Sequence, residues 1–242
     1  MIVFMRNSIL TFLGRDSGFG ENNNSAYVEI DNNLIIIDCG YTVFNKIKKI
    51  FDLQKYNEIS VIITHLHNDH AGSLSQLILY SYFVFSKKIK VISMCKNIKE
   101  YLDITGVPRE AYELCNRIGI EQENKVASNI DATHKFDLNE NIKFIKTEHV
   151  KYLDSFGFKL TINNKNIVYT GDSCNIESFL PYLKDCDEFY VDVSRYGGAH
   201  NQIDNVFPIL EKIKNDGTDV YLMHIDDKEY IRKVTNSEFG MD

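Results

Sequence analysis

The sequence predicts a mixed α/β fold in one domain. Short apolar runs rich in β-branched residues alternate along the chain with stretches that repeat apolar residues at helical spacing. The 242 residues suit one continuous core, and 44% hydrophobic and 12% aromatic content is enough to fill it. No repeat, low-complexity tract or Pro/Gly/Ser-rich linker divides the chain, which has only 3 prolines. We therefore expect residues 1–242 to form a single domain with paired strands.

In the first 93 residues, strands are predicted where apolar runs stop at turn residues. The strand over 9–14 ends at a stretch rich in Gly, Asp, Ser and Asn, and Asp31-Asn32-Asn33 predicts a hairpin turn. Apolar residues at positions 43, 47, 50 and 51 have helical spacing. The predicted strands cover residues 9–14, 26–30, 34–38, 59–63 and 90–93, and the predicted helices cover 43–53 and 73–82.

Residues 95–135 have a less regular pattern. Helices are predicted over 97–102 and 108–117, and Pro108 is well placed to begin the second one. We interpret the whole stretch 95–135 as a helical insertion over the edge of the domain and as a candidate lid.

The second half repeats the alternation of strands and helices. An Asn-Asn-Lys turn predicts a hairpin between two of its strands. The predicted strands cover residues 141–147, 156–162, 166–169, 188–193 and 219–223, and the predicted helices cover 176–183, 203–213 and 228–234.

Three histidines and one carboxylate follow the apolar run Ile59–Ile63. The segment Thr64-His65-Leu66-His67-Asn68-Asp69-His70-Ala71-Gly72 places them within six positions, directly after a buried strand. Neutral imidazole and carboxylate are preferred ligands of zinc and similar divalent metals. The alternative is a polar surface turn, but the whole chain has only 7 histidines. The concentration therefore favours a metal site.

The pattern His65-x-His67-x-Asp69-His70, with Gly72 behind it, resembles the central motif of the metallo-β-lactamase superfamily. The resemblance implies a four-layer αβ/βα sandwich with the site at one edge, between two sheets. His149, Asp172 and His224 each follow a predicted strand, in the order and of the kind that the superfamily needs. Each alone would more simply be a polar residue at a strand end, but together they favour further ligands.

The resemblance implies two divalent metal ions. Two such ions share a hydroxide, lower its pKa and neutralise the attacking and leaving oxygens, and Asp69 also orients that hydroxide. We expect Zn²⁺ from the richness in histidine, with Mn²⁺ or Fe²⁺ as alternatives. The implied ligands are His65, His67 and His149 for the first ion, Asp69, His70 and His224 for the second, and Asp172 as the bridge.

Asp38 ends a predicted strand and matches an early strand-end Asp of the superfamily. A metal-bound imidazole needs an acceptor for its other N–H, and Asp38 is our candidate for it. The alternative is that Asp38 only caps the turn before Gly40.

Three features resemble the ribonuclease Z-like phosphodiesterase branch of the superfamily. These are the glycine-rich opening over residues 12–18 with Asn24-Ser25, the bridging Asp172, and His200 in Gly197-Gly198-Ala199-His200. His200 matches a histidine of that branch that is not a ligand, and the resemblance implies that it protonates the leaving alkoxide or steadies the phosphate. The alternative for His200 is a surface residue that opens a helix.

The chain departs from ribonuclease Z in one respect. That enzyme has a long tRNA-gripping arm before the bridging Asp, whereas here only 172 − 149 = 23 positions separate Asp172 from His149. The formal net charge of −7 also argues against a long nucleic-acid footprint. The nearest resemblance is to members without the arm that hydrolyse cyclic phosphodiesters. We expect a 3′,5′-cyclic nucleotide to be opened to its nucleoside monophosphate; the alternatives are a tRNA 3′ endonuclease and a metal-dependent lactonase or thioesterase.

The substrate that this reading implies is a small anion. Tyr101, Tyr112 and Tyr196 are candidates to stack on a base, although simple packing is the favoured interpretation of these tyrosines. Arg195 is a candidate to pair with a phosphate oxygen. No role is assigned to His134. We expect a homodimer that makes contact through the apolar segment 74–85 or through residues 95–135.

The five cysteines form no CxxC pair, which predicts reduced, mostly buried thiols in a cytosolic protein. Cys174 lies near the predicted site, and we expect it to have a packing role. The N-terminus has no signal-peptide pattern, and no apolar run reaches the roughly 18 residues of a membrane span. We therefore expect a cytoplasmic protein without a membrane segment.

Overall fold

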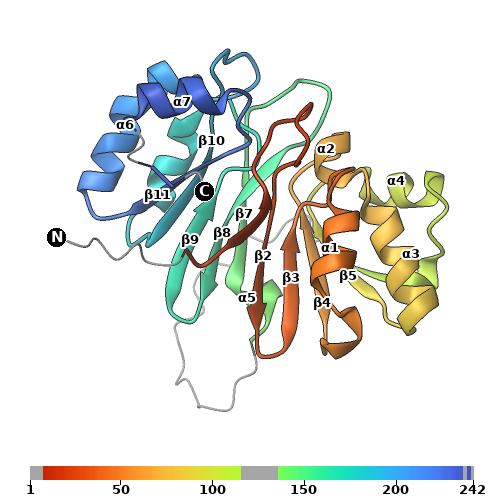
Figure 1. Ribbon diagram of the computed structural model, residues 1–242. Coiled ribbons are helices and arrows are strands. Elements are labelled where there is room, and N and C mark those ends of the chain that lie inside the picture. The colour runs from red at the N-terminus through yellow and green to blue at the C-terminus, as the bar shows by residue number, and fades with distance from the viewer. Residues whose placement is uncertain (1–7, 116–135, 237–238, 241–242) are drawn as a thin grey trace.

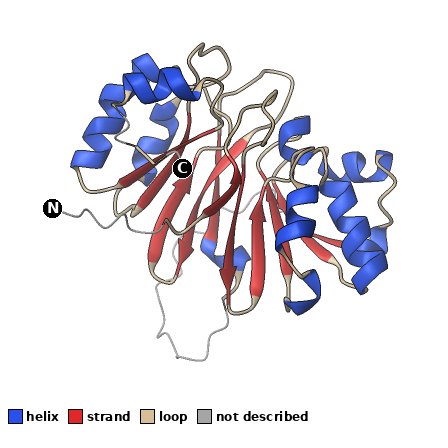
Figure 2. Cartoon of the chain, in the orientation of Figure 1, coloured by secondary structure: helices blue, strands red, loops and turns tan. Residues whose placement is uncertain are grey.

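The computed structural model describes residues 8–115, 136–236 and 239–240, and these form a four-layer sandwich (Figures 1 and 2). A six-stranded and a five-stranded sheet face each other, and helices cover the outer face of each. The first sheet consists, in order, of β1 (Thr11–Gly14), β2 (Ser25–Ile30), β3 (Asn33–Ile37), β4 (Ile59–Ile63), β5 (Ile89–Ser93) and β6 (Tyr112–Cys115). The second consists of β11 (Asp219–Met223), β10 (Glu188–Asp192), β9 (Lys165–Tyr169), β8 (Phe156–Ile162) and β7 (Ile142–Lys146).

Helices form the two outer layers. The longer helices beside the first sheet are α1 (Phe44–Ile50), α3 (Leu74–Phe85) and α4 (Ile98–Ile104), and those beside the second are α6 (Ile203–Asn215) and α7 (Lys228–Val234). Short helical turns are α2 (Asn68–Ala71), α5 (Leu138–Asn141), η1 (Leu53–Lys55), η2 (Arg109–Ala111) and η3 (Ile176–Tyr182). This arrangement is the predicted αβ/βα sandwich.

The central strands are apolar on both faces because each face packs against a different layer. In β3, Leu34 and Ile36 pack toward the helices, whereas Ile35 and Ile37 pack toward the second sheet. In β10, Val191 packs toward the helices and Tyr190 toward the first sheet. Strands buried on both faces read as continuous apolar runs, which explains why β3, β4 and β10 are visible in the sequence.

The hairpin between β2 and β3 turns at Asp31 and Asn32. Both residues have positive φ, 49° and 62°. Asp and Asn tolerate this conformation better than most residues, and a turn with two such residues matches the twist of an antiparallel pair. The predicted turn is therefore confirmed, with Asn33 already in β3.

The helical prediction for residues 108–117 is wrong at its centre. Pro108 precedes the turn η2, but Tyr112–Cys115 is β6, an edge strand parallel to β5. Together with α4, whose Ile98 is buried against the first sheet, this part belongs to the sandwich and does not lie over it as an insertion. Residues 116–135, the rest of the predicted lid, lie outside the described residues, as does His134.

The five cysteines are all described, and none forms a disulfide. Cys39, Cys95 and Cys186 are buried as predicted, but Cys174 is exposed, so the expected packing role for it is wrong. Burial raises the pKa of the Cys39 thiol to about 12, and that of the Cys95 and Cys186 thiols to about 11. No described helix is long and apolar enough to cross a bilayer.

Cys174 should therefore be the fastest thiol to react in the folded protein, because thiolate and access both limit the reaction. With Ellman's reagent we expect a single fast equivalent, which Cys174→Ser removes, and slower reaction at the half-buried Cys115. Denatured protein should release five equivalents. A fast equivalent that survives in Cys174→Ser would contradict the exposure of this residue.

Candidate metal centre and active site

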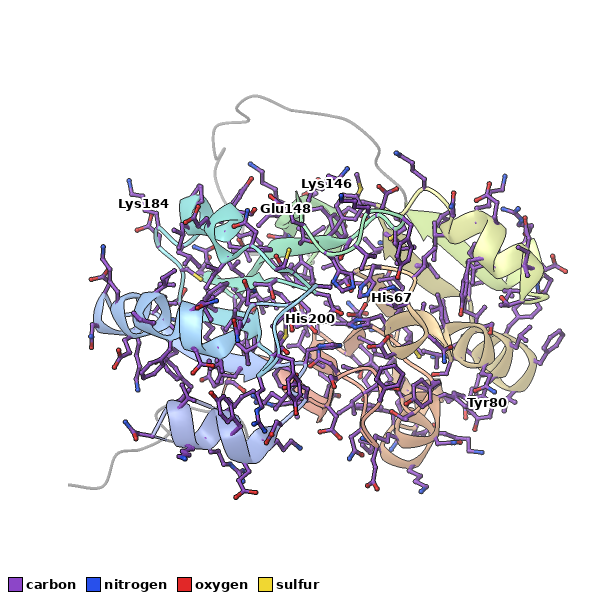
Figure 3. All side chains as sticks on the ribbon, turned by 90° about the horizontal axis from the view of Figure 1, so that it is seen from above. His67, Tyr80, Lys146, Glu148, Lys184 and His200 are labelled. Carbon is purple, nitrogen blue, oxygen red and sulfur yellow. The ribbon has the colours of Figure 1, made fainter. Side chains whose placement is uncertain are left out.

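The candidate site lies where the carboxyl ends of several strands meet. β3 and β4 run parallel in the first sheet, and β9, β10 and β11 run parallel in the second. β7 has the same direction as β9 because both are antiparallel to β8. Ligand sites of α/β sheets commonly lie beyond such strand ends. Figure 3 looks onto this edge, with His67 and His200 near its middle, where the two halves meet.

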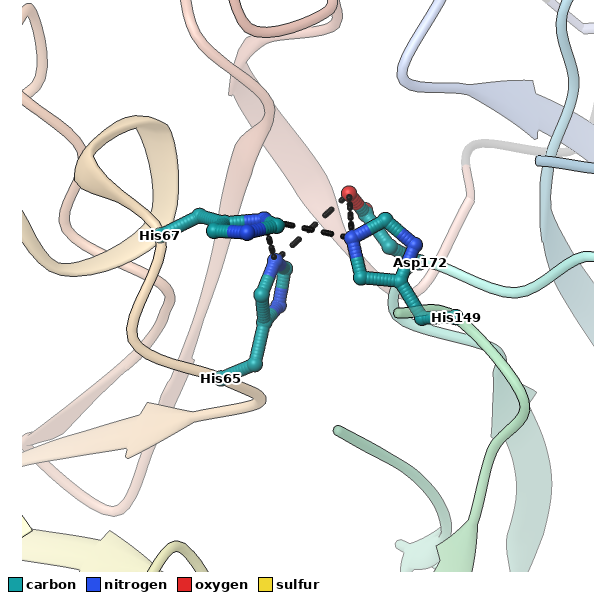
Figure 4. Close-up of side chains that lie close together, drawn as sticks. All are labelled: His65, His67, His149 and Asp172. Atoms are coloured by element: carbon teal, nitrogen blue, oxygen red, sulfur yellow. Dashed lines mark hydrogen bonds and ion pairs between the residues drawn. The ribbon is translucent and has the colours of Figure 1, made fainter. Parts of the chain in front are cut away.

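The first group of donors consists of three imidazoles and one carboxylate. His65 and His67 follow β4, His149 follows β7 and Asp172 follows β9, and their side chains point toward one another (Figure 4). Nδ1 of His67 lies 3.0 Å from Nε2 of His65 and 3.1 Å from Nε2 of His149. Oδ2 of Asp172 lies 3.6 Å from His65 Nε2 and 3.8 Å from His149 Nε2.

The second group shares Asp172 with the first. Oδ2 of Asp69 lies 3.3 Å from Nε2 of His70 and 3.1 Å from Nε2 of His224. Oδ1 of Asp172 lies 3.2 Å from His70 Nε2, and its Oδ2 lies 3.4 Å from His224 Nε2. One carboxylate thus faces both groups, which is the arrangement expected of a bridging ligand.

The donors fit divalent ions. Ligand atoms at about 2.0–2.2 Å from a tetrahedral ion lie about 3.4 Å apart, and the distances within the two groups are 3.0–3.8 Å. His70 Nε2 and Asp172 Oδ1 are buried, and neither has a hydrogen-bond partner in the described part of the chain. Buried polar atoms without partners are costly, and an ion held between the groups would satisfy both.

The carboxylates give the imidazoles of the two groups different protonation states. Burial holds the pKa of His65 well below its usual value, so its imidazole is neutral. Burial opposes ionisation of Asp172, but the histidines around it outweigh burial and hold its pKa well below the usual range. At His224 burial is again opposed, here by Asp172, Asp192 and Asp69, and the pKa rises to about 10. Metal binding releases protons from the ligands, so a bound cation would displace the proton that His224 carries.

Outer hydrogen bonds orient the imidazoles. Nδ1–H of His70 donates to Asp38 Oδ2 over 2.8 Å, and Nδ1–H of His149 donates to the carbonyl of Ala199 over 2.9 Å. Because these partners are acceptors, each Nδ1 carries a proton, and each Nε2 is the nitrogen that would present its lone pair to an ion. Asp38 also accepts from the backbone N–H and the hydroxyl of Thr64. The structure therefore shows the predicted contact of Asp38 with an imidazole.

Two residues of the site have strained backbone. Asp38 has φ = 58° and His224 has φ = 55°, the left-handed region that side chains other than glycine rarely adopt. Each is the first residue after its strand, so the chain turns sharply there and points the side chain into the site. Such conformations cluster at functional sites.

Replacement of Asp38 by asparagine should weaken metal binding about 10- to 100-fold, because an amide oxygen that accepts from His70 turns the NH₂ group toward the backbone N–H of Thr64, which then loses its acceptor. Competition with a chromophoric chelator would measure the affinity. The matched control is Asp31→Asn in the exposed hairpin turn, which should leave the affinity unchanged. Equal affinities of Asp38→Asn and the parent protein would show that Asp38 serves only the turn before Gly40.

His200 lies in the loop before α6, three residues ahead of its first residue, and not in the helix itself. Its Nδ1 lies 2.9 Å from Oδ2 of Asp192, which also accepts from the backbone N–H of Ser173. Burial lowers the pKa of His200, but Asp192 outweighs it, so the net shift is upward. The ring is half-buried and lines the cavity beside the donors.

Sequence reasoning missed Asp192. Its side chain is fully buried, it ends β10, and its Oδ1 lies 3.4 Å from Nδ1 of His224. The available signal was its place as the last polar residue of an apolar strand, the same signal that identified Asp38. Asp192 therefore hydrogen-bonds His200 and lies within ion-pair distance of His224.

A cavity of about 1290 Å³ opens over the donors. Residues from both halves line it, including His67, Asp69, His149, His200 and His224 among the predicted site residues. Its outer walls come from the loop after β1 and from the loop between β10 and α6, which rise at the same edge in Figure 1. The cavity is large enough for a nucleotide-sized ligand.

Of the residues predicted to contact the substrate, only some line the cavity. Tyr196 lines the cavity and is 72% exposed, so it remains available for stacking. Tyr112 is buried in the first core and the hydroxyl of Tyr101 donates to the carbonyl of Ala71, so both tyrosines pack the fold. Arg195 does not line the cavity, and its guanidinium pairs with Asp227 at 2.8 Å. The phosphate role suggested for Arg195 is therefore not supported.

The chain is similar to several known proteins. A profile of the family described as "Anti-Pycsar protein Apyc1" matches residues 8–241. The anti-Pycsar protein Apyc1 of Bacillus phage 010DV004 is 28% identical over 249 residues, which cover 96% of this chain and 95% of that protein.

Two solved structures show the same fold. The metallo-β-lactamase fold protein YhfI of Bacillus subtilis superposes with a TM-score of 0.70 at 18% identity, over 95% of this chain and 92% of that one. The short form of human tRNase Z gives a TM-score of 0.67 at 15% identity, over 96% and 95%. The predicted metallo-β-lactamase fold is thereby confirmed.

Proposed function

The chain belongs to the Anti-Pycsar protein Apyc1 family, and we propose that this metal-dependent hydrolase opens a 3′,5′-cyclic nucleotide to its nucleoside monophosphate. The observation that carries the proposal is the shared Asp172: two donor groups meet at one carboxylate, beside a His–Asp pair and within one cavity. The proposed ligands are the seven residues predicted from the sequence. We take Zn²⁺ as the ion and residues 1–242 as one domain, and the cytoplasmic location stays a prediction.

The metal ions, when bound, would activate water and neutralise charge on the phosphodiester. The side chains of the chain then have separate tasks. Asp69 has one oxygen 3.1 Å from His224, and its side chain is 13% exposed and lines the cavity, where it can orient the attacking water. His200, held by Asp192, is placed to protonate the departing ribose oxygen.

The cavity favours a small substrate over a long polyanion. Asp16, Glu21 and Asp226 line its outer part, and Lys228, the one lysine among its described lining residues, pairs with Asp16 at 2.8 Å. Phosphates away from the donors would meet these carboxylates, whereas proteins that bind long nucleic acids neutralise several phosphates. The interval between His149 and Asp172 contains only the hairpin β8–β9 and its flanking loops, with no arm.

The test is a substrate panel with purified protein and added Zn²⁺ or Mn²⁺. It includes 3′,5′-cyclic nucleotides, bis-p-nitrophenyl phosphate, a tRNA precursor and an acyl-homoserine lactone, each also with excess chelator. We expect metal-dependent release of nucleoside monophosphate. Cleavage of the tRNA precursor alone, or opening of the lactone alone, would replace the proposal by the corresponding alternative function.

We also propose a homodimer through α3. Phe83 and Val84 on this helix are 70% and 57% exposed, and Ile104 on α4 is 86% exposed. Light scattering should give a mass near twice the 28.0 kDa of one chain. A mass of one chain for the parent protein would contradict this assembly.

A further inference from the structure

Phe19 is an apolar side chain that is fully exposed at the wall of the active-site cavity. Its relative exposure is 105%, the highest among the exposed large hydrophobic residues of the described chain. Others, such as Ile50 and Phe83, lie on the outer helices α1 and α3. Phe19 lines the cavity over the donors, in the loop that follows β1. Tyr41 and Tyr196 line it too, but Tyr41 is only 43% exposed and the Arg195 guanidinium lies over the Tyr196 ring, 5.3 Å from its centroid. The Phe19 ring is therefore available, within the cavity, to an apolar or aromatic group of a bound ligand.

The turn that carries Phe19 is anchored on several sides. Gly20 N–H donates to the carbonyl of Ser17 over 2.9 Å, which closes a tight turn with Phe19 at its tip. Ser17 N–H donates to the carbonyl of Ile225, beside His224. The hydroxyl of Tyr41 donates to the carbonyl of Gly18 over 3.1 Å. The ring therefore projects from a held turn and not from a free loop.

The same turn touches the donor groups. A Cβ placed on Gly18 would lie only 3.1 Å from Oδ2 of Asp69. Phe19 is thus one residue from a point of contact with a proposed ligand, and Gly18 permits this approach. A molecule whose phosphate occupies the donor groups would extend its other end toward this turn.

Charge sets the direction in which such a molecule lies. Asp16, Glu21 and Asp226 outnumber Lys228, the one lysine among the described lining residues, so the outer cavity has a net negative charge that repels a phosphate there. An uncharged ring system has no such penalty. Aromatic side chains accept any nucleobase because every base has a π-face. We propose that Phe19 is the stacking platform for the nucleobase of the substrate, an inference that rests on the proposed cyclic-nucleotide function.

A binding experiment tests the platform without turnover. The chain contains no tryptophan, so Phe19→Trp would carry the only indole. With Zn²⁺ present, AMP should quench its fluorescence saturably, whereas ribose 5-phosphate should not. The matched control is Ile50→Trp on α1, also exposed, outside the surface proposed for the dimer and absent from the cavity lining. Equal quenching of both variants by AMP, or no quenching of Phe19→Trp by AMP concentrations that inhibit the enzyme, would overturn the proposal.

A kinetic experiment tests the role in substrate choice. For Phe19→Ala, the preference in kcat/KM for cyclic AMP over base-free ribose 3′,5′-cyclic phosphate should fall about 5- to 100-fold, mostly through KM. Phe19→Tyr should restore most of it. An unchanged preference in Phe19→Ala would contradict the platform. If the parent protein hydrolyses bis-p-nitrophenyl phosphate but no cyclic nucleotide, the proposed function fails, and the quenching by AMP still decides the role of Phe19.

Discussion

Replacing Asp172 by asparagine is expected to lower kcat/KM for a phosphodiester at least about 1,000-fold. Asp172 faces His65, His70, His149 and His224 at 3.2–3.8 Å, and it is the residue common to both donor groups. An amide keeps the shape of the side chain but lacks the charge and second acceptor oxygen that a bridge needs. Loss of several kcal/mol of charge stabilisation in the transition state corresponds to this factor.

Metal content separates this effect from misfolding. Asp172→Asn should bind fewer than two ions per chain by elemental analysis and should retain the circular dichroism of the parent. Asp154→Asn provides the control, because Asp154 is not among the proposed ligands and, within the described residues, its carboxylate pairs with Lys96 and Lys146 at 3.8 and 3.9 Å. If Asp172→Asn had full metal content and activity within tenfold of the parent, Asp172 would not be the bridging ligand.

Replacing His200 by glutamine should have the second-largest effect, with a dependence on the leaving group. A cyclic nucleotide releases a ribose alkoxide, which needs a proton, so its kcat should fall about 100- to 10,000-fold. Bis-p-nitrophenyl phosphate releases a stabilised phenolate, so its hydrolysis should fall far less. The physical reason is the position of His200, which lines the cavity and is oriented by Asp192 without belonging to the proposed ligands.

The informative readout is the ratio of the two losses. Both substrates are measured with the same zinc-loaded preparation, so a change in metal content affects them together. Asn205→Ala on α6 is the control, since Asn205 is exposed and its side chain donates to Gln202, one turn earlier, in the described part of the chain. Equal losses for the two substrates would assign His200 to binding or to structure instead of proton transfer.

The proposed ligands were predictable because they follow strands that are themselves easy to read. β4 and β11 are buried on both faces or nearly so, and a polar residue directly after such a run stands out. His149, Asp172 and His224 then occur in the order of the superfamily's remaining ligands, which supported the resemblance. The sequence could place these side chains at strand ends, but only the fold could bring the ends of two sheets together.

Other features depend on tertiary contacts that no local pattern encodes. β6 has four residues, lies at a sheet edge and includes the exposed Glu113, so its sequence resembles a helix start after Pro108 as well as a strand. Asp192 acquires its role through contacts with His200 and His224 on other segments. The exposure of Phe19 and of Cys174 is likewise a property of the folded surface.

The distance between the two sheets also sets the distance between the ligands that each sheet contributes to the metal centre. His65 and His70 are attached to the first sheet, and Asp172 and His224 to the second. The side chains between the sheets, such as Phe158, act as spacers that set how far apart these halves stand. A smaller spacer would let the layers approach or slide and would shift ligands that it never touches. The packing between the two sheets is therefore one determinant of the affinity of the site for its metal ions.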